Sequence, residues 1–392
     1  MLAPLSAQMA HGLLSPSARI LVAAALPTAT DVDTLPWEQV HWPTLLSLTA
    51  YERAEMSVSL LLRRAPSCVP EDVRLAIRGL DRVAQFRSAE FEDAAGSAVD
   101  ALAAAQVPVL WLKGAALAMQ SSAGFGIRGM GDLDLLVAPA DRIRAREALA
   151  AAGWSSPVVE GYEHHHHDAP MLRPGGLRLE LHTGLFPLDH PFADDSASVW
   201  LSRGVEVGWG HRRVRVLPQP WHVVHASTHW TWSHEGTVGS WQYLHDIHRL
   251  TAGWAMDGTE WEAVVTNARE MGASLPVGWG VWSAHCVTGL ELSQHVVDRL
   301  RGRRSLLDGL AERQWVLAAF RSPAGSPSVR WSRFWWRRAM RGLGDAGGRW
   351  PWAVGRAAQL SPQSDPQTIA GGAPRDRLEQ WQRHLARVVR SW

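Results

Sequence analysis

Apolar and polar residues alternate along a short segment in the middle of the chain, which is the pattern of a half-buried strand. In residues 132–137, DLDLLV, one face would carry Leu133, Leu135 and Val137, and the other Asp132 and Asp134. The apolar face predicts contact with a core. The two carboxylates would therefore converge on one side of the strand.

The same alternation returns in residues 177–183, LRLELHT. One face consists of leucines, and the opposite face carries Arg178, Glu180 and His182. Residues 174–176, Pro-Gly-Gly, predict a turn just before this strand. We expect the strand to pair with the one that precedes it, and it could also lie beside residues 132–137.

Apolar residues at three- and four-residue spacing on both sides of these strands predict helices. The expected helical segments are 20–25, 37–62, 73–105 with a start at Pro70, 114–119, 141–152 and the chain from Pro220 onward. Further strands are expected at 107–112 and 211–217. The expected fold class is α/β (α+β), a small mixed-sheet core flanked by helical N- and C-terminal regions. The expected units are residues 1–104, 105–217, 218–300 and 301–392.

Composition narrows the class of protein. The chain has 392 residues, 46% hydrophobic and 20% charged, which is typical of a folded protein with two or three units. No apolar run reaches the length of a membrane span, so we expect a cytoplasmic protein without one. The two cysteines, Cys68 and Cys286, are far apart, which argues against a disulfide partner and a cysteine metal site.

Lys113 is the only lysine in the chain, and Asn267 is the only asparagine. This bias is typical of a GC-rich genome, so the abundance of arginine carries little functional information. A lysine that persists at the end of a predicted strand is correspondingly informative. Gly114 follows it and opens a predicted helix, whose first N–H groups could bind an anion.

Asp132 and Asp134 are costly neighbours unless a cation lies between them, because like charges repel and raise one pKa. A divalent cation, Mg²⁺ above all, is the simplest partner. Glu180 could supply a third carboxylate, and three carboxylates can hold two metal ions. The alternative is that residues 132–134 form the solvated face of an edge strand.

Histidines occur in two places that could serve a site. Residues 163–168, EHHHHD, invite a metal interpretation, but on a strand at most two of these histidines share a side. We favour a polar lining of an acceptor pocket over a metal site, with Glu180 or His182 as the further ligand in the metal case. Trp221, His225 and His229 share one face of a predicted helix, a stripe that is more often packing than ligand.

Several motifs follow one another over residues 105–186. They are Leu112-Lys113-Gly114, Gly126 with Arg128, residues 132–137, Gly153-Trp154, His166-His167 and residues 179–182. Together they resemble the nucleotidyltransferase superfamily with the DNA polymerase beta-like fold, and within it a bacterial family of uncharacterised nucleotidyltransferases. Most of the superfamily carries Gly-Ser where this chain has Lys113-Gly114.

The resemblance implies a metal-dependent transfer of a nucleoside monophosphate from an NTP to an acceptor, with release of pyrophosphate. Asp132, Asp134 and Glu180 would be the catalytic residues and the ligands of Mg²⁺ or Mn²⁺. The nucleotide-binding residues would be Lys113, Gly114 and Arg128, although Arg128 could instead pair with an aspartate and steady its loop. The candidates for acceptor contacts are His167, His182, His229 and Asp246, the last two also as an auxiliary base.

The C-terminal residues 301–392 contain 17 Arg and 6 Asp or Glu, a net charge of +11. Residues 331–338, WSRFWWRR, interleave aromatic and basic side chains, which suits RNA, a membrane surface, an acidic peptide or simple helix packing. Residues 361–375 read as a linker. The alternative function is therefore a catalytically inactive nucleotide-binding or scaffold protein that acts through this basic region. The acceptor, whether small molecule, peptide, protein or RNA, stays open.

Overall fold

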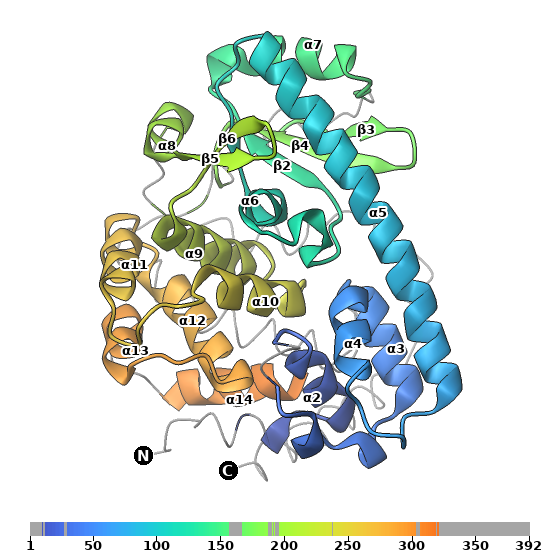
Figure 1. The fold of residues 1–392 in the computed structure, drawn as a ribbon. Coiled ribbons are helices and arrows are strands. Elements are labelled where there is room, and N and C mark those ends of the chain that lie inside the picture. Colours follow the sequence, from blue (N-terminus) through green and yellow to red (C-terminus); the bar gives the residue numbers. More distant parts are fainter. Residues whose placement is uncertain are drawn as a thin grey trace, which may run out of the picture.

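The structure is a computed structural model in which a mixed sheet stands at one end and a helical assembly at the other (Figure 1). It describes residues 10, 12–26, 30–156, 167–186, 190, 192, 196–236, 238–302, 306–318 and 320. The expected linker, the Arg/Trp-rich segment and residues 163–166 lie outside the described residues.

Six strands form the sheet in the order β3-β4-β2-β1-β6-β5. Their bounds are β1 Leu110–Trp111, β2 Leu133–Leu136, β3 Met171–Arg173, β4 Leu177–His182, β5 Val205–Trp209 and β6 Arg212–Val216. β2 runs parallel to β4 and antiparallel to β1, while β1 runs parallel to β6. The expected mixed α/β class is confirmed. β2 lies inside the sheet, so Asp134 does not belong to the edge strand of the alternative interpretation.

The alternation predicted for the two central strands is confirmed. Leu133 and Leu135 of β2 and Leu179 of β4 are fully buried in one hydrophobic cluster, together with Phe91 of helix α5. Leu136 points to the other face and joins a second cluster. The face that carries Asp134 therefore looks toward the helical end of the molecule.

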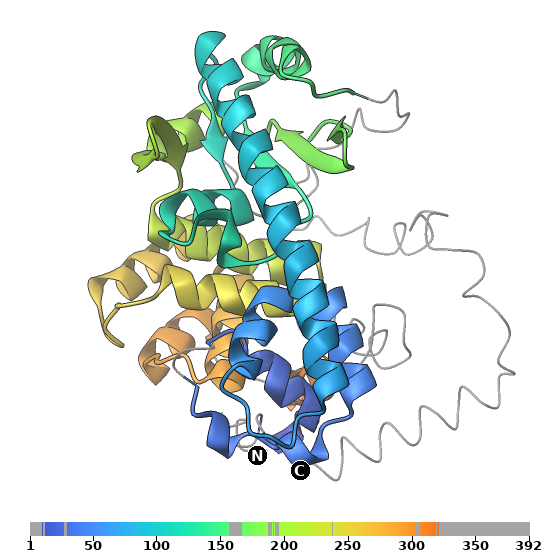
Figure 2. The same cartoon turned by 45° about the vertical axis from the view of Figure 1, so that its right-hand side comes forward.

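Helix α5, Glu71–Ala104, connects the two ends (Figure 2). With 34 residues it is about 51 Å long at 1.5 Å per residue. Its first turn carries Glu71 and Asp72, which favour a helix N-terminus. Its C-terminal half packs on the leucine face of the sheet beside α7, Arg142–Ala151.

The predicted helical segment 37–62 is not continuous. It divides into a 3-10 turn, Trp37–Gln39, then α3, Trp42–Tyr51, and α4, Glu55–Leu62. The corner between α3 and α4 contains Arg53, whose φ of 54° lies in the left-handed region. Between residue 184 and the strand expected at 211–217 we expect loops, but the structure adds α8, Ala197–Arg203, and strand β5 there.

The remaining helices form the helical end together with the N-terminal region. They are α2 Pro16–Ala23, α9 Gln219–Thr228, α10 Ser240–Leu250, α11 Thr259–Glu270, α12 Ser274–Thr288, α13 Gln294–Arg301 and α14 Leu306–Ala318. One hydrophobic cluster contains residues of α2, α3 and α4 as well as of α9 to α14. Fully buried Trp241, Trp261 and Trp279 are part of it, so these tryptophans serve helix packing. The division into four units stays a prediction.

None of the described helices combines the length and hydropathy that a membrane crossing requires. Cys68 is exposed, Cys286 is buried, and both are free thiols.

Candidate functional site

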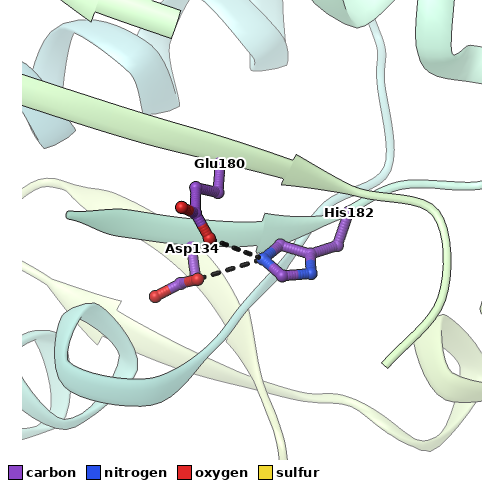
Figure 3. A group of neighbouring side chains, drawn as sticks. All are labelled: Asp134, Glu180 and His182. Carbon is purple, nitrogen blue, oxygen red and sulfur yellow. Dashed lines mark hydrogen bonds and ion pairs between the residues drawn. The ribbon is translucent and has the colours of Figure 1, made fainter. Parts of the chain in front are cut away.

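Asp134 of β2 is the most densely contacted carboxylate of the sheet. Its Oδ1 accepts a hydrogen bond from Lys113 Nζ at 2.7 Å. The same oxygen accepts a second one from His182 Nε2 at 3.0 Å (Figure 3). Its side chain is only 3% exposed. Burial alone would raise the pKa of Asp134, but Lys113 and His182 hold that pKa well below its usual range. Asp134 is therefore ionised at neutral pH.

Glu180 and His182 reach Asp134 from the neighbouring strand, because β2 and β4 are parallel and in register. Asp134 lies opposite Glu180, and Leu136 lies opposite His182. His182 Nε2 is 3.7 Å from Glu180 Oε2, and one ligand atom from each of Asp134, Glu180 and His182 lies within 4.8 Å of the others (Figure 3). These three residues could hold a metal ion.

Burial is the main influence on the protonation of His182 and of Glu180. Burial lowers the pKa of His182 to about 4, so its imidazole is neutral at pH 7 and its Nε2 donates to Asp134. Burial and the charges of Asp134 and Asp132 raise the pKa of Glu180. A carboxylate with a raised pKa next to other carboxylates is a candidate general base or a ligand that needs a cation.

Asp132 lies one residue before β2 and is not one of the three residues, Asp134, Glu180 and His182, whose ligand atoms lie together. Among the described residues it makes no ion pair within 4 Å. Burial and the neighbouring Asp134 raise its pKa, while Lys113 and Arg53 lower it less. Among the described residues only Asp134 of these three carboxylates accepts a hydrogen bond from a cation, so Asp132 and Glu180 keep carboxylate oxygens that a divalent cation could bind. Oxygen donors of this kind fit Mg²⁺ or Mn²⁺, and the His182 nitrogen suits Mn²⁺ better than Mg²⁺.

Lys113 begins helix α6, Lys113–Gln120, with a left-handed φ of 49°. Such a conformation is unusual for a residue other than glycine, and it is found most often at functional sites. Burial works to lower the pKa of Lys113, but the charges of Asp134 and Asp132 outweigh it and raise that pKa. The lysine is therefore charged, and the structure confirms its place at the end of the first strand.

Arg128 has a partner that the sequence did not name. Its Nε and Nη2 donate to the two carboxylate oxygens of Asp246 in helix α10, at 2.7 and 2.8 Å, and its Nη1 donates to Gly129 O at 2.9 Å. Both side chains are buried, and Arg128 lowers the pKa of Asp246 to about 2 against the effect of burial. This geometry favours the loop-steadying interpretation of Arg128 over phosphate binding. It also makes Asp246 a weak base.

Gly114 is explained by the same arginine. A Cβ at Gly114 would lie 2.7 Å from Arg128 Nη2, closer than real Cβ contacts. The helix start of α6 and the Arg128 side chain therefore fit together only with glycine at this position.

Helix α9 brings histidines over the site. His225 is buried, its ring lies 6.0 Å from that of His229, and both rings feel the charge of Lys113. Burial lowers the pKa of His229 well below its usual value, so it is neutral. A π-helical turn, His229–Ser233, begins at this residue, and such turns are frequent at functional sites. His167 lies on the other side, with its ring 5.1 Å from that of His182.

Two residues that the sequence did not indicate contact the loop before Asp132. The first is Arg53: a Cβ at Gly131 would collide with its guanidinium, and a Cβ at Gly129 would be 2.9 Å from its Cβ. The second is Gln242, whose Nε2 donates to Gly129 O at 2.9 Å. Gly129 and Gly131 indicate in the sequence that another part of the chain comes close to this loop, but they do not identify the residue.

A family model described as uncharacterised nucleotidyltransferase matches residues 38–289, more than half of the chain. The chain belongs to this family. No curated protein and no solved structure matches it. The matched range contains Arg53, Lys113, the three carboxylates and the histidines of α9. Family membership supports transferase activity in general.

The Arg128–Asp246 pair gives a first prediction. We expect Arg128→Gln and Asp246→Asn each to lower the free energy of unfolding by about 3 kcal/mol, because each leaves a buried charge without its partner. The double variant should cost about 2 kcal/mol less than the sum of the two. Chemical denaturation of the four proteins measures this coupling. A coupling near zero, with stability unchanged and NTP affinity reduced in Arg128→Gln, would return Arg128 to the phosphate site.

Lys113 gives a second prediction. Its ammonium reaches Asp134 as a point charge, and Arg128 lies against the adjoining Gly114. A planar guanidinium at position 113 is larger and differently shaped. Lys113→Arg should lower kcat/KM for NTP by more than about tenfold, which is about 1.4 kcal/mol, although the net charge is unchanged. Arg82→Lys, on an exposed position of α5, is the matched control and should change nothing. An unchanged kcat/KM in Lys113→Arg would exclude Lys113 from the site.

Proposed function

We propose that this protein transfers a nucleoside monophosphate from an NTP to an acceptor in a reaction that depends on Mg²⁺ or Mn²⁺. One observation carries the proposal. The Asp134 carboxylate joins a lysine, a neutral histidine and the opposing Glu180 on the sheet face that looks toward the helical end. Family membership supports the reaction class, and this arrangement supports its assignment to this face of the sheet.

The reaction forms a bond from an acceptor oxygen to the α-phosphorus of the NTP. The bond from that phosphorus to the bridging oxygen of the β-phosphate breaks, pyrophosphate leaves, and the acceptor proton passes to a base. Bound metal ions would neutralise phosphate charge and lower the pKa of the acceptor hydroxyl. Asp132, Asp134 and Glu180 are the residues that would hold them.

The chain's own residues divide the remaining work. Lys113 carries positive charge beside the carboxylates, and with the first N–H groups of α6 at Gly114 it is placed to bind phosphate. Glu180, whose pKa is raised, is placed to accept the acceptor proton. Arg128 acts through Asp246 by fixing the loop that leads to Asp132.

The acceptor is proposed to enter between β4 and the start of the π-helical turn. His167 lies beside His182, and His229 lies near Lys113; each offers a polar ring at the border of the cluster of carboxylates. His182 itself belongs to that cluster, because it donates to Asp134. Asp246 is occupied by Arg128 and is not part of this proposed acceptor surface.

The test is nucleotidyl transfer from each of the four α-labelled NTPs, with Mg²⁺ or Mn²⁺ and host lysate as the source of acceptor. Asp132→Asn and Asp134→Asn should each lower transfer by at least about 100-fold, on the order of 2.7 kcal/mol. Glu180→Gln should lower turnover more than it weakens NTP binding, because it is proposed to serve the acceptor. Glu147→Gln, on the exposed face of α7, is the control.

Labelled product from both aspartate variants at rates within tenfold of wild type would contradict the metal-dependent mechanism. NTP binding by the wild type without any labelled product would instead support a nucleotide-binding protein without catalysis.

A further inference from the structure

We propose that Arg53 is a further residue of the nucleotide site and that its guanidinium binds the phosphates of the NTP. The inference rests on the proposed function and deepens it, because it assigns part of the site to the N-terminal helical region.

The backbone of Arg53 is fixed in an unfavourable conformation. Its φ of 54° is left-handed, which is unfavourable for a residue with a side chain. The neighbours hold it there: the Arg53 N–H donates to Ala50 O at 3.3 Å, and Ala54 N–H donates to Thr49 O at 2.9 Å. The buried Glu52 accepts a hydrogen bond at 3.0 Å from the backbone N–H of Trp241 in α10. The corner is therefore anchored to the helical end, and Arg53 projects from it.

Arg53 reaches the loop directly before the carboxylates. Its own carbonyl oxygen lies 3.0 Å, and its Cβ 2.9 Å, from the place where Gly129 would carry a Cβ. Its guanidinium fills the space that a side chain at Gly131 would need, one residue before Asp132. Two glycines thus allow an arginine from a distant part of the chain to lie beside the candidate active site.

Arg53 differs from the other cations of the site in its partners. Lys113 is bonded to Asp134, Arg128 to Asp246, and Arg178 lies 3.8 Å from Glu180. Within the described part of the chain, the Arg53 guanidinium makes no hydrogen bond or ion pair, and the residue is exposed. Its N–H donors are therefore available.

A triphosphate matches this group by charge and by shape. Arginine presents a planar fork that binds phosphate oxygens in pairs. Its positive charge attracts phosphate to a loop where the carboxylate of Asp132 alone would repel it. The competing explanation is that Arg53 only packs on Gly129 and Gly131 to steady the loop. Loss of a loop-steadying contact would weaken the binding of a nucleoside monophosphate and of its triphosphate equally. Loss of a phosphate contact would weaken the binding of the triphosphate more.

The experiment is isothermal titration of each of the four NTPs, with its matching nucleoside monophosphate, in the presence of Mg²⁺. The proteins are wild type, Arg53→Gln, Arg53→Lys and the control Arg82→Gln, whose arginine is exposed on α5 away from the loop. Arg53→Gln should weaken NTP binding at least tenfold and monophosphate binding less than threefold. Arg53→Lys, which keeps the charge, should recover part of the loss, and the control should match wild type.

Equal NTP affinity in wild type and Arg53→Gln would overturn the assignment, as would an equal loss of NTP and monophosphate binding. If Arg53→Gln does not fold, Arg53→Lys decides: an NTP affinity equal to wild type would overturn the assignment, and one at least threefold weaker supports it. If wild type binds none of the four NTPs, the proposed function fails, and the Arg53 assignment fails with it.

Discussion

The buried negative charge of Asp134 is the constraint on which the site depends. A carboxylate 3% exposed in the middle of a sheet is costly unless cationic or hydrogen-bonding groups surround it. Lys113 at the end of β1 and His182 at the end of β4 meet that need from the two strands that flank β2. Burial and the neighbouring carboxylates raise the pKa of Glu180 and of Asp132, so these two side chains are not stabilised as Asp134 is. The same feature that makes the cluster costly makes it a suitable place for a cation and a triphosphate.

The loop that precedes Asp132 is positioned by both helical regions. From α10, Asp246 holds Arg128, and Gln242 donates to Gly129 O. From the corner between α3 and α4, Arg53 lies on Gly129 and Gly131. The sheet alone would leave this loop without those contacts, so the helical regions belong to the candidate site. The family match, residues 38–289, includes every residue that makes these contacts with the loop.

Local patterns predicted the parts of the site that depend on neighbouring residues in sequence. Strand alternation placed Asp134 and Glu180 on one face, and the single lysine identified the end of the first strand. The pairing of Arg128 with Asp246 could not be read in the same way, because 118 positions separate the two residues and helical packing alone brings them together. Arg53 was hidden inside a segment that reads as continuous helix, since a left-handed corner leaves no periodic signal. The glycines at 129 and 131 indicated close approach without naming the partner.

Crystals grown with Mn²⁺ and a non-hydrolysable NTP analogue test the central claim most directly, because manganese is located by its anomalous scattering. The account predicts a manganese peak within coordination distance of the carboxylate oxygens of Asp134 and Glu180, with the triphosphate beside Lys113. Nucleotide bound elsewhere on the chain, with no manganese at these carboxylates, would contradict it.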